Sequence, residues 1–232
     1  MRFRSMVSVF AFALIQAIAP FASADTIVDV SPNDAGSGGS SFRIGGVNSQ
    51  VEMMSWTQSG SYTGVSISAL VGSVNGSSAS VDAYLSKAVG SSATSADLID
   101  STTVTAPAFA GAADITSLTL FSNETLAAGT YYLTLFNSDT TPGDTNIRWA
   151  FGSAVNTGTG VTGGFANALA GNGTPNTTSP WKSDFNTSSV DLGFTVTGTA
   201  ASAVPEPSTL ALMGLGGIGL MVRAYRRRMA AV

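Results

Sequence analysis

The 232-residue sequence contains no cysteine and no histidine. Without cysteine the chain can form no disulfide framework and has no thiol nucleophile. Without histidine it cannot assemble a Ser–His–Asp or Cys–His triad, and a zinc site would need carboxylates alone. These absences remove the commonest hydrolytic and zinc-dependent enzyme classes, so we expect a protein that is not an enzyme and that needs no cofactor.

Charge is also scarce, because only 10% of the residues are Asp, Glu, Lys or Arg. From Asp25 to Glu206, four basic residues stand against fourteen acidic ones, which gives this part a net formal charge of −10. Nucleic acids require a basic binding surface for their phosphates. The acidic body therefore predicts no nucleic-acid partner, and it argues equally against binding to anionic membrane surfaces.

The N-terminus has the three parts of a secretory signal peptide. Met1–Arg4 is positively charged, Ser5–Ala19 is almost wholly apolar, and Ala22-Ser23-Ala24 is a small-residue cleavage site. This pattern predicts removal of residues 1–24, with Ala22 and Ala24 marking the cleavage site and Asp25 beginning the mature chain. An uncleaved N-terminal membrane helix is the alternative.

The C-terminus carries a second membrane-directed segment. Val204-Pro205-Glu206-Pro207 is stiff and extended, because each proline fixes its own φ and restricts the residue before it. The run Leu210–Val222 has no charge, and four arginines follow it, namely Arg223, Arg226, Arg227 and Arg228. An apolar run closed by basic residues is typical of a membrane helix with a cytoplasmic tail. From Pro207 to Val222 such a helix would be about 24 Å long, short for a bilayer core of about 30 Å, which suits a temporary anchor.

This order resembles the PEP-CTERM protein-sorting signal of Gram-negative bacteria. The resemblance implies that Pro205, Glu206 and Pro207 form the motif recognised by an exosortase, a membrane transpeptidase-like enzyme. It also implies transient anchoring in the inner membrane, removal of the tail, and delivery to the cell surface or an exopolysaccharide matrix. An ordinary tail anchor with a chance Pro-Glu-Pro sequence is the alternative.

Between the two terminal segments, residues 25–203 form one predicted domain, followed by the sorting segment 204–232. Short apolar runs that alternate with period two predict about nine strands. The expected strands are Thr26–Val30, Gln50–Thr57, Tyr62–Val74, Ser80–Lys87, Thr102–Ala106, Ile115–Phe121, Thr130–Phe136, Ile147–Phe151 and Val190–Thr199. We expect an all-β fold, an antiparallel β-sandwich or jelly roll, with helices only in the signal peptide and the membrane segment. The glycine-rich stretch Asn156–Lys182 reads as a long loop.

The body also resembles the choice-of-anchor β-sandwich modules of secreted bacterial proteins, over most of Val51–Thr197. The resemblance rests on Met54-Ser55-Trp56, Tyr84–Ser92, the run from Leu126 to Leu135, and Arg148-Trp149-Ala150. That family has no established catalytic residues, so it implies a fold and no chemistry.

These observations predict an exported, non-enzymatic surface or matrix protein associated with exopolysaccharide or biofilm. A carbohydrate-binding module is the first alternative, with aromatic rings contacting the ligand; the candidates are Trp149 and Trp181, with Tyr62 and Tyr84. An ice-binding protein is the second alternative, which would need ladders of threonines; the sequence offers Thr103/Thr105 and Thr195/Thr197.

Carboxylates supply the remaining candidate chemistry. A calcium site could form around Asp139, Asp144 and Asn146, where oxygen ligands gather about a turn; the alternative is an Asx-stabilised hairpin turn. A glycosidase would need a pair of acids, and the available aspartates are Asp82, Asp97, Asp100, Asp114, Asp184 and Asp191. Their scatter along the chain favours solubilising surface charge.

Overall fold

The computed structural model describes residues 23–32, 41–45, 50–73, 78–107, 114–138, 147–167, 173–188, 191–201 and Arg226. The chain divides into two compact units, residues 1–200 and 201–232. Among the described residues, every strand lies in the first unit, between Asp25 and Ala200. Apart from Ser23, Ala24 and Arg226, the predicted signal and membrane helices lie outside the described residues. Within the described part of the chain, no helix is both long and apolar enough to cross a membrane.

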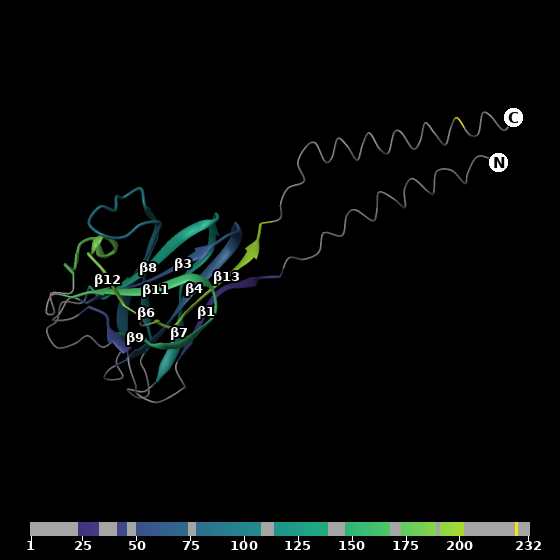
Figure 1. The fold of residues 1–232 in the computed structure, drawn as a ribbon. Helices are drawn as coiled ribbons and strands as arrows, with labels where there is room; N and C mark the ends of the chain where they lie inside the picture. The colour runs from purple at the N-terminus through teal and green to yellow at the C-terminus, as the bar shows by residue number, and fades with distance from the viewer. Residues whose placement is uncertain are drawn as a thin grey trace. The chain divides into compact units, whose positions relative to one another are not determined.

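The strands form two sheets, and every pair of neighbouring strands is antiparallel (Figure 1). The seven-stranded sheet has the order β10-β1-β13-β4-β9-β2. Its seventh strand, β7, lies off this path and pairs with β4. Its members are β1 (Asp25–Pro32), β2 (Ser41–Arg43), β4 (Tyr62–Ser73), β7 (Ile115–Leu126), β9 (Ile147–Ala150), β10 (Gly152–Thr157) and β13 (Phe194–Ala200).

The six-stranded sheet has the order β12-β11-β3-β8-β5-β6. Its members are β3 (Val51–Gln58), β5 (Ala79–Ser86), β6 (Leu98–Ala106), β8 (Gly129–Phe136), β11 (Thr159–Ala166) and β12 (Asn186–Ser188). The 3-10 helix η2 (Pro180–Lys182) precedes β12 and packs against β5 and β8. The prediction of an all-β fold of antiparallel sheets is confirmed.

One hydrophobic core contains side chains from both sheets. Trp56 of β3 and Phe194 of β13 meet across it, with ring centroids 5.8 Å apart. The backbone N–H of Leu192 also donates to the sulfur of Met54, at 3.4 Å. Since residues i and i+2 of a strand share a face, each core strand contributes alternate side chains to this layer. The arrangement is consistent with the predicted sandwich.

The predicted facing of several strands is confirmed. Buried residues of β4, β5 and β13 point into the shared core, as their alternation indicated; they are Val65, Ile67 and Ala69, then Val81, Ala83 and Leu85, then Phe194 and Val196. Leu192, just before β13, is buried in the same core. In β7 the register includes shifts opposite β4. Leu118, Leu120 and Phe121 are buried there, whereas Ile115 is 39% exposed.

The prediction of one long loop over Asn156–Lys182 is wrong. The end of β10, the whole of β11 and η2 fall within it. β11 contains three glycines, which are poor strand formers and usually indicate loops. Here the missing side chains are required by close packing, because a Cβ on Gly164 would lie 2.9 Å from Cε of Met53 and 3.2 Å from the carbonyl oxygen of Asn186.

Candidate functional site

The first and last strands of the domain lie side by side in the seven-stranded sheet. β1 and β13 are antiparallel neighbours, and Asp25 is paired with Gly198. Ala200, the last residue of β13, is paired with Tyr62 at the start of β4. Tyr62 is in turn paired with Leu126, at the end of β7. The chain therefore enters and leaves the sandwich at one end of these strands.

Gln58 fastens two turns together at this end. Its Nε2 donates to the carbonyl oxygens of Gly60 at 3.2 Å, Leu126 at 3.3 Å and Ala127 at 3.0 Å. Its Oε1 accepts from Nε1 of Trp56 at 3.3 Å. Because Gln58 is buried, its amide, the indole N–H and the turn carbonyl groups bond to one another in place of water. The side chain links the β3–β4 turn to the β7–β8 turn, and each of these turns connects one sheet to the other.

An aromatic layer supports this hydrogen-bond network from inside the core. Tyr131 packs on Trp56 with ring centroids 5.6 Å apart, and its hydroxyl donates to the carbonyl oxygen of Ala127 at 2.8 Å. Burial raises the pKa of Tyr131, although the bond to Ala127 opposes that shift. We refer to Asp25, the Gln58–Ser61 turn, the Leu126–Gly129 turn and Ala200 together as the Gln58 end.

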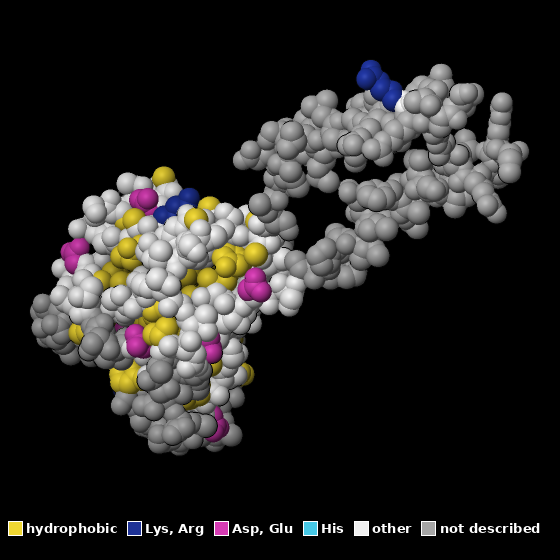
Figure 2. Space-filling model, turned by 45° about the vertical axis from the view of Figure 1, so that its right-hand side comes forward, with side chains coloured by type: hydrophobic (Ala, Val, Ile, Leu, Met, Phe, Trp, Pro, Cys, Tyr) yellow, Lys and Arg dark blue, Asp and Glu magenta, His cyan; other side chains and the backbone are white. Residues whose placement is uncertain are grey.

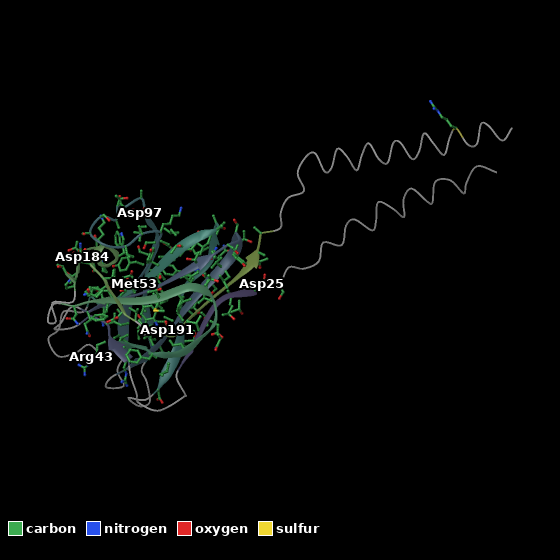
Figure 3. The ribbon with its side chains drawn as sticks, viewed as in Figure 1. Asp25, Arg43, Met53, Asp97, Asp184 and Asp191 are labelled. Carbon is green, nitrogen blue, oxygen red and sulfur yellow. The ribbon has the colours of Figure 1, made fainter. Side chains whose placement is uncertain are left out.

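Figure 3 shows that Asp25 lies apart from the other labelled charged residues of the domain, including Arg43, Asp97 and Asp184. Ala24, a residue of the predicted signal cleavage site, is exposed beside it. Its companion Ala22 lies outside the described residues. The predicted cleavage point therefore sits in an accessible part of the chain, directly before β1.

The two tryptophans proposed as ligand contacts are both buried. Trp149 is 0% exposed in the core, and its Nε1 donates to the carbonyl oxygen of Gly193 at 2.8 Å. Trp181, in η2, is 8% exposed and packs on Tyr84 with ring centroids 5.2 Å apart. Neither ring presents an open face on which a sugar could stack.

η2 covers part of the outer face of the six-stranded sheet. Ser86 of β5 and Thr134 of β8, the two strands against which η2 packs, are both 0% exposed. Their hydroxyl oxygens and Nε1 of Trp181 have no hydrogen-bond partner. Tyr84, whose ring packs on Trp181, is the register partner of Thr134 and is followed two residues later in β5 by Ser86.

The aspartates considered for catalysis are held by local structural bonds. Asp82 accepts from the hydroxyl of Thr103 at 2.6 Å and from the backbone N–H of Ser138 at 3.1 Å. Asp97 accepts at 2.8 Å from both the backbone and the hydroxyl of Thr94, bonds that lower its pKa. Asp184 accepts from the backbone N–H of Ser91 at 3.2 Å. Each of these carboxylates therefore secures a loop or a strand end.

One pair of carboxyl groups does meet, across the β6 and β7 edges. Burial raises the pKa of Glu124, and the charge of Asp100 and a hydrogen bond to Asp100 raise it further. Directly bonded carboxyls leave no room for the sugar and water that glycosidases place between their acids, at separations of about 5 Å or more. In the described part of the chain, no three Asp or Glu residues gather where they could hold a metal ion.

Acidic side chains are scattered singly over the face drawn in Figure 2, among mostly uncharged polar atoms. Asp114 is exposed and Asp191 is half-buried. The calcium candidates Asp139, Asp144 and Asn146 lie outside the described residues. The acids on the visible face are therefore dispersed and do not form a cluster there.

Sequence reasoning missed Glu52. It lies in β3 between Leu135 of β8 and Phe165 of β11, on the same face as Met54 and Trp56. The residue is 0% exposed, and neither carboxyl oxygen has a hydrogen-bond partner. Burial raises the pKa of Glu52 well above its ordinary value of 4.5. Val51, Met53, Met54, Ser55 and Trp56 are buried as well, so burial does not alternate around Glu52 and the sequence gave no sign that this glutamate points inward.

The predicted sorting residues Pro205, Glu206 and Pro207 lie outside the described residues, as do Arg223, Arg227 and Arg228; Arg226 is exposed. Comparison with protein-family models identifies the segment that contains these residues: residues 203–228 match the PEP-CTERM protein-sorting motif. The chain carries a PEP-CTERM sorting signal. No curated protein and no solved structure matches the chain.

The PEP-CTERM signal marks the chain as an exported protein that an exosortase processes, after transient anchoring in a membrane and before sorting to the cell surface. The motif begins three residues after Ala200. The Gln58 end of the sandwich is therefore the part of the described domain that is joined to the PEP-CTERM signal by the shortest length of chain.

Proposed function

We propose that this protein is a non-enzymatic component of the bacterial cell surface or of its exopolysaccharide matrix, released from the membrane by exosortase. The PEP-CTERM match at residues 203–228 carries the proposal. The domain supports it, because Asp82, Asp97 and Asp184 serve structural bonds and the sequence contains no histidine and no cysteine. A compact β-domain with an acidic surface suits a solvated matrix component.

Intact-mass spectrometry of the protein from culture supernatant and from the cell envelope tests the proposal. We expect a species that begins at Asp25 and ends near Val204–Pro207 in the surface or supernatant fraction. A species that retains Arg223–Arg228 as the final product would make the chain a permanently anchored protein and would overturn the proposal. Co-purification with matrix polysaccharide tests the finer assignment to the matrix.

One surface supports a second candidate function, the binding of ice. Thr195, Thr197 and Thr199 alternate with core residues along β13 and are part-exposed. By register, their partners on β4 are the hydroxyl residues Ser68, Ser66 and Thr63. Ser68 continues the row to Thr119 of β7, to which its hydroxyl donates at 3.2 Å.

In a regular sheet such rows repeat at about 4.8 Å between strands and at roughly 6.7 Å along a strand. The rows of Thr195 and Thr197 follow this pairing, and a register shift separates them from the row of Thr199. A thermal-hysteresis assay on the domain tests this candidate, with Thr197→Lys as the variant that should abolish any activity. Wild-type protein without thermal hysteresis would exclude it. The carbohydrate-binding alternative has weaker support, because Trp149 and Trp181 are buried.

A further inference from the structure

The Gln58 end carries both chain segments that the cell must process. The predicted signal peptide joins the domain at Asp25, and the PEP-CTERM signal follows Ala200. We propose that the Gln58 end is a contact surface for the exosortase, against which the enzyme closes while it holds Pro205-Glu206-Pro207. This inference rests on the proposed processing by exosortase.

The length of the connecting chain enforces the contact. Five residue steps separate Ala200 from Pro205, and an extended chain spans at most about 3.6 Å per residue, so the motif lies within about 18 Å of β13. A folded domain of only 100 residues already has a radius of gyration of about 13 Å. An enzyme whose active site encloses Pro205 must therefore contact the sandwich.

The N-terminal segment points to the same orientation. Because Asp25 is paired with Gly198, the predicted signal peptide and the PEP-CTERM signal leave the domain from adjacent strands. Both segments are directed to the membrane in the precursor. The Gln58 end is therefore turned toward the membrane, where the processing enzyme resides.

The surface at this end suits a protein partner better than a lipid surface. Its exposed turn residues are small and uncharged, namely Ser59, Ser61, Ala127 and Ala128. Small side chains allow another backbone to approach closely. Asp25 supplies the charge here, and a negative charge disfavours anionic lipid headgroups. The bonds of Gln58 hold both turns in place, so little ordering is needed on contact.

The test is the rate of tail removal in the producing bacterium, followed by pulse labelling of the full-length chain. Ala127→Glu with Ala128→Glu adds bulk and charge to one turn, and we expect processing to slow at least fivefold. Ser59→Glu with Ser61→Glu repeats the test on the other turn. Inserting ten Gly/Ser residues after Ala201 should restore the rate in both variants, because the enzyme can then stand clear of the domain.

Controls separate contact from folding and from the sorting signal itself. Ser78→Glu with Thr105→Glu alters two exposed residues where β5 begins and β6 ends, and should be processed at the wild-type rate. Thermal unfolding of each domain variant checks that it is folded. Wild-type processing rates in both turn variants, or slow rates that the insertion does not restore, would overturn the contact. Normal processing of Pro205→Ala with Pro207→Ala would instead overturn the proposed function.

Discussion

At the scale of single residues, Glu52 is the costliest side chain in the described core. A buried polar group without a partner costs about 1–3 kcal/mol, and ionising it there would cost more. The fold avoids the charge by raising the pKa of the carboxyl through burial. The folded domain therefore holds a proton on Glu52 at pH values where the unfolded chain, with the ordinary pKa of 4.5, has released it.

This difference gives stability a defined pH dependence. The contribution of Glu52 is most favourable below the pKa of the unfolded chain and is lost as pH rises toward the folded pKa. We expect the free energy of unfolding to fall from pH 4.5 upward, measured by urea denaturation. Glu52→Gln should remove most of that slope, and Glu52→Met should add about 1–3 kcal/mol of stability at pH 7.

Ser55→Ala, a change at a neighbouring buried residue of β3 that carries no charge, is the control for Glu52 and should keep the wild-type slope. Glu124, whose pKa is also raised, adds a slope of the same sign, so the comparison between variant and wild type is the decisive quantity. Parallel curves for wild type and Glu52→Gln would show that Glu52 ionises in the folded domain without penalty.

At the scale of elements, most core strands could be predicted from the sequence and the strands near the glycine-rich stretch could not. β4, β5 and β8 alternate apolar and polar residues, and one buried face imposes that period directly. β11 has Gly160, Gly163 and Gly164 in place of side chains, because β3 and β12 flank it closely. Such a strand is stabilised by its neighbours' contacts, which no local pattern records.

The role of Gly164 can be measured. Gly164→Ala places a methyl group 2.9 Å from Cε of Met53, which can move, and 3.2 Å from the carbonyl oxygen of Asn186, which is backbone. We expect a loss of about 1–3 kcal/mol, the usual cost of overpacking. Gly60→Ala is the matched control, since its added methyl group meets only ordinary contacts beginning at 3.5 Å. Equal stability of the two variants would mean that β11 is loosely held.

The cover made by η2 gives a second prediction at this scale. Trp181→Ala removes the ring that packs on Tyr84, and we expect it to cost about 3–5 kcal/mol and to speed amide exchange in β5. Trp181→Phe keeps an aromatic contact and removes an unpartnered N–H, so it should cost far less. Trp149→Phe is the contrasting variant, because it loses the bond to Gly193. Similar losses in the two Phe variants would show that Nε1 of Trp181 is bonded in solution, for example to water.

At the scale of the whole molecule, the sequence predicts a role for each terminus, and the fold shows where both termini leave the domain. The predicted signal peptide and the PEP-CTERM motif are local patterns that can be recognised without a structure. The pairing of β1 with β13 depends on contacts between residues more than 160 positions apart along the chain, which have no local signature. The Gln58 end could therefore be recognised only from the fold.

The position of β13 predicts where the chain can be cut without loss of the domain. β13 lies inside its sheet, bonded to β1 on one side and to β4 on the other, whereas the chain after Ala200 belongs to a separate unit. A fragment of residues 25–203 should unfold at the temperature of the mature protein. A fragment of residues 25–195 should fail to fold, because it loses Val196 from the core and exposes the hydrogen-bonding edges of two strands. Differential scanning calorimetry of both fragments checks this, and a cooperative transition in the shorter one would contradict it. Exosortase cleavage beyond Ala200 thus removes the anchor while leaving the sandwich complete.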